Sequence, residues 1–294
     1  MASVFPITMN FAVSSRNRHK KIKKTSPFGR SFFIAIRSFP YYNEVTQGGV
    51  FMWENSELKQ RAKAVLKRFG FWLPFAVTLV AGIIYSDIGE LFSVITENPG
   101  FAELYENEYI GPVLSLILPS LALVSLVWVI FVGDPIIIGQ NRFFMEHRIS
   151  GSKLEKLFFV FKSGNYFNVV KTMFLMSIKI ILWSFLFIIP GIIKTYQYSM
   201  VPYILAENPG IEPKRALELS KEMTSGEKFN IFLLELSFFG WFLLSAFTCG
   251  IGIFFVMPYL NATFAELYQV MREKAHSQNL SDFNELPGFF PEQE

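Results

Sequence analysis

Two apolar regions of this chain are longer than one membrane crossing, and their length constrains the fold more than any other feature. Residues 172–206 would span roughly 52 Å as a straight helix, and residues 229–268 roughly 60 Å. The hydrocarbon core of a bilayer is only about 30 Å thick. A further run, residues 113–132, contains no charged side chain and is long enough to cross once. The chain is therefore predicted to cross a membrane several times.

Each long region contains a helix-breaking sequence near its middle. Pro190-Gly191 interrupts the first region, and Cys249-Gly-Ile-Gly252 interrupts the second. If each region crossed only once, the basic connector between them would face outward, although Lys and Arg prefer cytoplasmic loops. Folding back is therefore expected in both regions. The predicted spans lie at about residues 71–88, 113–138, 171–190, 191–206, 229–248 and 251–268.

A short pattern recurs near the ends of three apolar regions: a proline followed four positions later by a small residue. It joins Pro135 to Gly139, Pro202 to Ala206, and Pro258 to Ala262. We interpret the pattern as one helical hairpin used three times. The predicted fold is all-α, a polytopic membrane protein with six transmembrane helices arranged as three helical hairpins. A single membrane domain would occupy residues 52–274, followed by a polar C-terminal tail, residues 275–294.

Composition supports this class of protein. Hydrophobic residues make up 51% and aromatic residues 17% of the 294 residues, which is too apolar for an ordinary soluble domain. The single cysteine, Cys249, excludes an intramolecular disulfide framework and a metal cage built from cysteines.

A basic leader precedes the predicted membrane domain. Residues 1–51 hold eight of the 27 Lys and Arg but only one acidic residue, Glu44. Such a tail can bind anionic lipid or nucleic acid. We favour another explanation, because residues 47–50 can be encoded as CAAGGAGGTG, a bacterial ribosome-binding sequence at normal spacing from a start codon at Met52. The leader is interpreted as an upstream region wrongly read as coding, and no nucleic-acid partner is expected.

Two amphipathic helices are predicted on the cytoplasmic side. The first begins soon after Met52 and the second covers residues 212–224, with Pro213 in its first turn. The apolar side of the first helix holds Leu58, Ala62, Val65, Leu66 and Phe69, and its basic side holds Lys59, Arg61, Lys63, Lys67 and Arg68. We interpret the first helix as a basic cap on the first span, and the second as lying along the inner interface.

A few polar side chains fall within the predicted spans, where a charge costs at least about 2.5 kcal/mol at mid-depth. Lys179 and Glu235 lie at matching depths in the third and fifth spans, and we expect them to form an ion pair. Glu266 is expected to reach headgroups or a basic side chain, and Asn261 and Thr263 to bond backbone or neighbouring helices. Asp134 is interpreted as a polar group near the inner end of the second span. An ion, proton or substrate site at these residues is the alternative.

The sequence offers little support for an enzyme. The three histidines, His19, His147 and His276, all lie outside the predicted spans, and no metalloprotease helix or paired intramembrane aspartates are present. The serines of the spans, Ser184, Ser199, Ser237 and Ser245, have no membrane histidine to accept a proton. We therefore predict no catalytic residues, no metal and no cofactor.

Part of the chain resembles a known family. Three stretches carry the resemblance: WSFLFIIPGIIK at residues 183–194, YQYSMVPYILAENP at 196–209 and FLLELSFFGW at 232–241. They are similar to a bacterial integral-membrane family, common in Firmicutes, that is known as domain of unknown function 975. The resemblance extends over residues 57–268, except that Glu227 stands where the family pattern has a histidine. It implies a multi-pass membrane protein and no catalytic residues.

These features together predict an uncharacterised multi-pass protein of a bacterial plasma membrane, with both termini in the cytoplasm. The favoured function is a non-enzymatic scaffold or accessory protein whose basic helices contact anionic lipid. Its partners would be the lipid bilayer, other membrane proteins or a second copy of itself. A transporter of small solutes, lipid or peptides is the first alternative, and a lipid-modifying membrane enzyme is the second.

Overall fold

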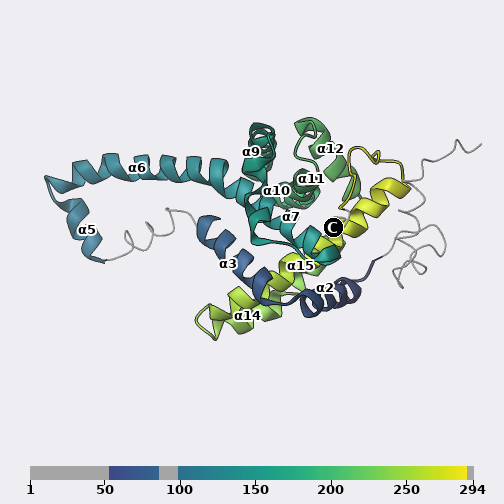
Figure 1. The fold of residues 1–294 in the computed structure, drawn as a ribbon. Coiled ribbons are helices and arrows are strands. Elements are labelled where there is room, and N and C mark those ends of the chain that lie inside the picture. The colour runs from purple at the N-terminus through teal and green to yellow at the C-terminus, as the bar shows by residue number, and fades with distance from the viewer. Residues whose placement is uncertain (1–52, 86–98, 290–294) are drawn as a thin grey trace, which may run out of the picture. The chain divides into compact units, whose positions relative to one another are not determined.

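The computed structural model describes residues 53–85 and 99–289, which form helices joined by short connections, without any strand (Figure 1). The all-α prediction is confirmed for these residues. The predicted leader, residues 1–51, lies outside the described residues, as do the end of the predicted first span and the last five residues of the tail.

The helices follow one another along the chain with few long connections. The first half contains α2 (Asn55–Phe69), α3 (Trp72–Tyr85), α5 (Pro99–Glu106), α6 (Ile110–Trp128), the π-helix η1 (Val129–Gly133), α7 (Asp134–Ser150), the 3-10 helix η2 (Leu154–Phe158) and α8 (Phe159–Lys162). The second half contains α9 (Tyr166–Leu186), α10 (Ile188–Tyr198), α11 (Val201–Glu207), α12 (Pro213–Met223), α13 (Lys228–Leu236), α14 (Phe239–Ala246) and α15 (Ile251–Ser277).

The two predicted amphipathic helices are both present. In α2 the buried residues are Leu58, Ala62 and Leu66, and this face packs on α15. Gly70 follows α2 with φ 93°, a conformation that glycine adopts without steric cost, and α3 leaves at 106° to α2. In α12, Pro213 occupies the first turn, and the apolar face packs on α9, α10 and α15.

The predicted second span is part of a much longer helix. The elements α6, η1 and α7 run without interruption from Ile110 to Ser150, which extends the predicted span of residues 113–138 in both directions. The π-helix falls immediately before Asp134 and Pro135. Proline lacks the N–H that would continue the α-helical bonding pattern, and a π-bulge is one way to accommodate that loss. Only 6% of the most apolar 18-residue stretch of this helix is buried by the rest of the protein.

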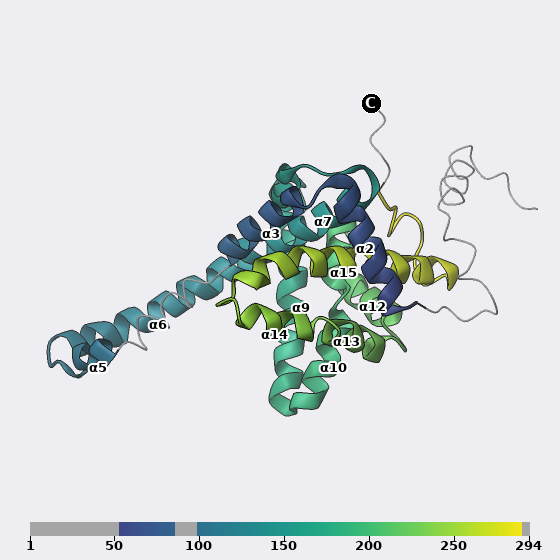
Figure 2. The same ribbon diagram turned by 90° about the horizontal axis from the view of Figure 1, so that it is seen from below.

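The first long apolar region breaks one turn earlier than predicted. Helix α9 ends at Leu186, Phe187 is extended with φ −158°, and α10 then packs back on α9 (Figure 2). Pro190 therefore lies in the first turn of α10, where no backbone N–H is needed. A Cβ on Gly191 would come within 2.3 Å of the Ser184 hydroxyl, so the close approach of the two helices requires glycine here.

The second long region breaks where the sequence predicted. Cys249 and Gly250 have positive φ values of 51° and 83°, and α15 begins at Ile251. Helix α15 packs against α14, the two lying side by side in Figure 2. The predicted fifth span, residues 229–248, corresponds to α13 and α14, which are separated by only two residues at Ser237 and together count as one apolar helix long enough to cross a membrane.

The three proline-bearing helices form the centre of the packing. Helix α7 packs on both α11 and α15, and Tyr203 of α11 stacks on Tyr268 of α15 at 5.5 Å. The small residue of each repeat is buried, and a Cβ on Gly139 would lie 1.9 Å from the backbone oxygen of Leu157. The repeated pattern therefore marks the segments by which the helices approach one another. Four helices of the described part are long and apolar enough to cross a membrane, or five if the bent pair α2 and α3 counts as one span.

Candidate functional site

Two groups of polar side chains join the proline-bearing helices just beyond their apolar segments: Arg148 with Glu266, and Glu207 with Tyr268 and Arg272. Helix α7 contributes Arg148, α11 contributes Glu207, and α15 contributes Glu266, Tyr268 and Arg272. We call these five residues the ion-pair cluster. They come from segments far apart in the sequence, so the cluster exists only because the three helices pack together.

Arg148 and Glu266 form a two-point contact in the ion-pair cluster. Arg148 Nε lies 3.0 Å from Glu266 Oε1, and Arg148 Nη2 lies 3.1 Å from Oε2, so the guanidinium binds both carboxylate oxygens. The Glu266 side chain is only 4% exposed. The sequence predicted that Glu266 would reach headgroups or a basic side chain, and the structure places it between helices, against Arg148.

Glu207 has no exposed side-chain surface, and its carboxylate accepts two hydrogen bonds and lies beside one cation. The hydroxyl of Tyr268 donates to Oε2 at 2.7 Å, and the backbone N–H of Gly288 donates to Oε1 at 2.6 Å. Arg272 Nη1 lies 3.7 Å from Oε1 and supplies a positive charge. Burial of a carboxylate is tolerated when it is paired and hydrogen-bonded in this way.

A second group of charges joins α7 to the neighbouring helices. Glu146 lies between Arg142 and Lys156, at 2.7 Å and 2.9 Å. Arg142 also donates to the backbone oxygen of Ala206 at 2.9 Å, and its guanidinium lies 3.8 Å from the centre of the Phe159 ring. Arg142 thus ties the end of α11 to α7 and α8.

Glu227, where the resemblance led us to expect a histidine, connects α15 to the start of the described chain. Its carboxylate accepts from Lys274 at 3.1 Å, from the Trp53 indole at 3.1 Å and from the Asn230 amide at 3.0 Å. Lys274 also donates to the backbone oxygen of Ser225. Sequence reasoning missed this role, because a glutamate at the start of a helix looks like an ordinary surface residue.

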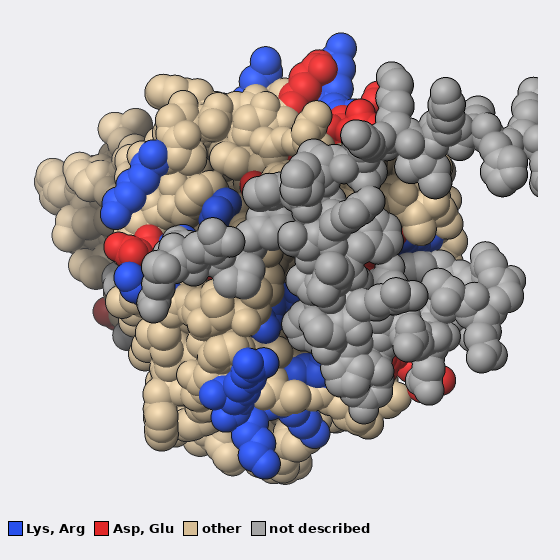
Figure 3. Space-filling model, turned by 45° about the vertical axis from the view of Figure 1, so that its right-hand side comes forward, with Lys and Arg blue, Asp and Glu red and all other residues tan. Residues whose placement is uncertain are grey.

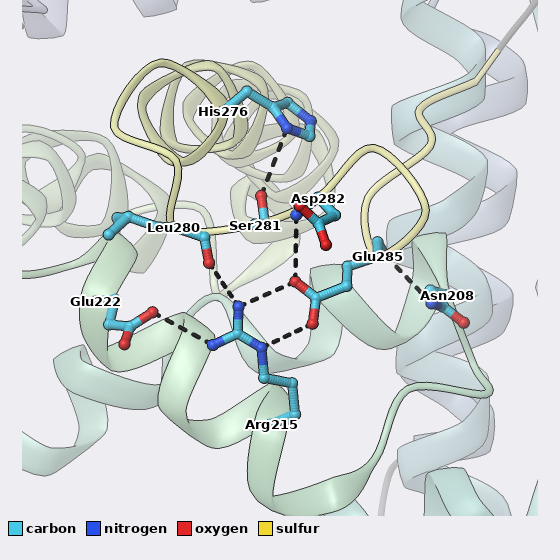
Figure 4. Close-up of polar contacts among 8 residues, drawn as sticks. All are labelled: Asn208, Arg215, Glu222, His276, Leu280, Ser281, Asp282 and Glu285. Carbon is cyan, nitrogen blue, oxygen red and sulfur yellow. Dashed lines mark hydrogen bonds and ion pairs between the residues drawn. The ribbon is translucent and has the colours of Figure 1, made fainter.

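The described part of the predicted polar tail stays in contact with the helices. Residues 278–289, which we call the C-terminal strap, return along the surface of α12 and α11 (Figure 4). Glu285 binds Arg215 through both oxygens, at 2.7 Å and 2.9 Å. Arg215 also donates to the backbone oxygen of Leu280 and contacts Glu222, and Asn208 donates to the backbone oxygen of Glu285.

The strap contact is expected to weaken in acid. The hydrogen bonds from Arg215 lower the pKa of Glu285 below its usual value, and those to Glu285 raise the pKa of Arg215. A carboxylate with a lowered folded pKa contributes stability above the ordinary glutamate value of about 4.3, which is lost as the pH falls through the folded pKa. We therefore expect hydrogen exchange of the strap amides, corrected for intrinsic rates, to rise below pH 4. The Glu285→Gln variant should show no such step, and an unchanged step in it would contradict the assignment.

The predicted ion pair between Lys179 and Glu235 is wrong. Both side chains are exposed, and the Glu235 carboxylate accepts a hydrogen bond from the Tyr196 hydroxyl at 2.6 Å instead. The prediction used only the distance of each residue from the start of its helix. That distance does not identify partners, because the rotation of each helix decides which side chains face one another.

The other predicted polar residues have different surroundings. Thr263 is buried and donates to the backbone oxygen of Tyr259, one turn earlier in α15, at 2.8 Å. The amide nitrogen of Asn261 is buried without a hydrogen-bond partner, as is Nε2 of His147. Asp134 is buried at the start of α7. The structure does not bring these residues together into one site.

The serine hydroxyls of the predicted spans are all engaged locally. The hydroxyls of Ser184, Ser199, Ser237 and Ser245 each donate to a backbone oxygen three or four residues earlier. No group of three His, Cys, Asp or Glu side chains could hold a metal ion among the residues that the structure describes. One open cavity of about 320 Å³ lies beside the start of α2 and is lined by Trp53, Glu54, Asn55, Ser56, Asn230 and Leu233.

Comparison with known proteins agrees with the family resemblance. No curated protein and no solved structure matches the chain. A family model does match, over a stretch that begins at the end of α9 and covers all but the last residues of α15. The resemblance noted in the sequence is therefore confirmed there. Over residues 186–275, this chain has the sequence of the family described as Protein of unknown function (DUF975).

Proposed function

We propose that this protein is a non-enzymatic scaffold or accessory protein of a bacterial plasma membrane. The pairing of its buried glutamates supports this proposal most directly. Glu207, Glu227 and Glu266 each bind a cationic side chain from another part of the chain. Buried charges that are paired and hydrogen-bonded fix the packing of helices, and these three carboxylates are not free to bind a solute.

The proposed arrangement has six spans in three hairpins, with both termini in the cytoplasm. The packing of α10 on α9 and of α15 on α14 is consistent with folding back in both long apolar regions. Folding back places the connector that carries Lys214, Arg215 and Lys221 on the same side as the ion-pair cluster. Basic connectors of this length remain in the cytoplasm.

The basic face of α2 would bind anionic lipid at the cytoplasmic surface of the membrane. Lys63, Lys67 and Arg68 are exposed, while Lys59 donates to the backbone oxygen of Ser237 at 3.0 Å. Figure 3 shows Lys and Arg side chains gathered near the bottom of the face in view, in the region of α2. Each basic residue near an anionic membrane surface contributes about 1 kcal/mol of attraction.

A transporter of small solutes, lipid or peptides is the second candidate, and one observation favours it. The amide nitrogen of Asn261 is buried without a partner in α15. A buried polar group that lacks a partner in the resting protein is available to a solute.

Thiol labelling in intact cells tests both the arrangement and the function. Cys249 is exposed at the turn before α15, and we expect a membrane-impermeant maleimide to label it from outside. In a Cys249→Ser background, Lys221→Cys should react only after the membrane is permeabilised. Thr263→Cys, which replaces a fully buried side chain, should stay unlabelled in both conditions if the helix interior is sealed.

Two outcomes of this experiment would contradict the proposal. Labelling of Lys221→Cys in intact cells would place the basic connector outside and remove the six-span arrangement. Rapid labelling of Thr263→Cys, with Ala62→Cys on the buried face of α2 unreactive as a matched control, would show a water path into α15 and favour the transporter.

A further inference from the structure

Lysines from four helices gather around one side chain, Lys194 of α10. Helix α10 packs on α9, α12 and α13 (Figure 2). The positive charges of Lys179, Lys221 and Lys228, one from each of these helices, all act on Lys194. We call these four residues the lysine cluster. Like charges repel one another, so a group that brings them together needs a negative charge to offset the repulsion.

The described part of the protein does not supply that negative charge. None of the ammonium groups of the lysine cluster forms an ion pair with another described side chain. Helices α9 and α10 contain no acidic residue, and the single acid of α13, Glu235, accepts from the Tyr196 hydroxyl. On α12, Glu222 contacts Arg215, and Glu218 is exposed.

Neutral groups hold the central lysine in position. The Lys194 ammonium lies 3.1 Å from the side-chain oxygen of Gln197 and 4.9 Å from the centre of the Trp183 ring. An ammonium has three N–H donors, and the glutamine oxygen accepts from one of them. Elsewhere between the helices the cations have carboxylates, as Arg272 and Lys274 do. The lysine cluster is thus arranged to bind an anion from outside the chain.

The surroundings of the lysine cluster show what kind of anion fits. One turn after Lys194, the backbone oxygen of Gln197 accepts from Ser220 of α12, a helix that lies on the cytoplasmic side in the arrangement proposed above. The hairpin of α9 and α10 exposes apolar side chains on its other side of Lys194 along the sequence, among them Leu182, Ile188, Ile192 and Ile193. A molecule with an anionic head and apolar chains contacts both surfaces, whereas a soluble anion uses only the lysines.

We propose that the lysine cluster binds the phosphate group of one anionic phospholipid of the inner leaflet, whose acyl chains lie along the hairpin of α9 and α10. Basic pockets between membrane helices on the cytoplasmic side bind such headgroups. The phosphate offsets both the repulsion between the lysines and the cost of placing charge at membrane depth. This site is separate from the basic face of α2, and it rests on the proposed arrangement only for the choice of leaflet.

Quenching of tryptophan fluorescence by a brominated lipid tests the proposal. The full-length protein in detergent micelles is titrated with phosphatidylglycerol that carries bromine on its acyl chains, because bromine quenches tryptophan only at close range. We expect the unaltered protein to be quenched at low lipid, and the Trp183→Phe protein to lose most of this first phase, since Trp183 lies beside Lys194. The Lys194→Gln/Lys221→Gln protein should need about tenfold more lipid, because two of the attracting charges are gone.

Three controls make the result specific to the lysine cluster. The Lys63→Gln/Lys67→Gln protein loses the same charge from the basic face of α2 and should keep the first phase of quenching. Brominated phosphatidylcholine, which has no net charge, should require about tenfold more lipid. Inorganic phosphate in large excess should not displace the phosphatidylglycerol, because it cannot contact the apolar hairpin. Circular dichroism of each variant shows that the helices remain folded.

Four outcomes would overturn the proposal. Two of them are equal quenching of the unaltered and Lys194→Gln/Lys221→Gln proteins, and equal quenching by phosphatidylcholine. Displacement by inorganic phosphate would mean that the ligand is a soluble anion. An equal loss of affinity in the Lys63→Gln/Lys67→Gln protein would mean that only the total charge matters. None of these outcomes affects the labelling of Cys249 or Thr263→Cys, so failure here is distinguishable from failure of the scaffold proposal.

Discussion

Replacing Arg148 by alanine is expected to destabilise the folded protein by about 3–5 kcal/mol, which is the usual cost of leaving a buried charge without its partner. Glu266 would retain its negative charge while its side chain is almost completely removed from water. Pairing with Arg148 is what makes that burial tolerable, because both carboxylate oxygens accept from the guanidinium. Unfolding in mixed detergent micelles, followed by circular dichroism as the fraction of dodecyl sulfate rises, measures the loss.

The double variant Arg148→Met/Glu266→Leu is the informative control. It removes both charges and keeps apolar volume, so it should recover most of the stability lost in Arg148→Ala. The variant Arg61→Ala breaks an exposed pair with Glu57 within α2 and should change stability by only about 0.5 kcal/mol. If Arg148→Ala were as mild as Arg61→Ala, the pair with Glu266 would not be buried as the structure has it.

Replacing Gly139 by alanine is expected to produce the second large effect, because there is no room for a methyl group. The added Cβ would lie 1.9 Å from the Leu157 backbone oxygen and 2.6 Å from the carbonyl carbon. Backbone atoms cannot move aside as a flexible side chain can, so η2 would have to separate from α7. Overpacking of this kind costs about 3 kcal/mol or more. The same detergent unfolding experiment would show the loss, and the yield of folded protein should fall with it.

Gly82→Ala provides the matched comparison. Gly82 also lies within a helix, but nothing approaches a Cβ placed there. Alanine favours a helix over glycine, so this variant should be neutral or more stable by about 0.5 kcal/mol. A Gly139→Ala protein as stable as Gly82→Ala would show that α7 and η2 do not approach as closely as described.

Features that depend on local sequence were predicted well. The amphipathic pattern of α2, the glycine break before α15 and the proline in the first turn of α12 all follow from the properties of a few neighbouring residues. The first fold-back was placed slightly late, because Pro190 was interpreted as the break itself. A proline fits the first turn of the following helix just as well. The number of membrane spans stays a prediction.

Contacts between distant segments could not be predicted in the same way. Glu235 has a tyrosine from α10 as its partner, and Glu266 reaches a basic side chain, Arg148 of α7, rather than headgroups. Nothing near Glu207 in the sequence indicates that Tyr268 and Gly288 will both reach it. Such pairings depend on the rotation of each helix and on the path by which the chain returns, and neither is specified by the local sequence.

The uninterrupted helix from Ile110 to Ser150 has a mechanical consequence. It would be roughly 60 Å long. Its first part is apolar and almost entirely exposed, and its last turn carries Arg148. A thicker or thinner bilayer changes the tilt of a helix inside it. A change of tilt would move Arg148 relative to Glu266, unless the helix bends at the π-helical turn of residues 129–133. The strength of the contact between α7 and α15 would then depend on the lipid composition of the membrane.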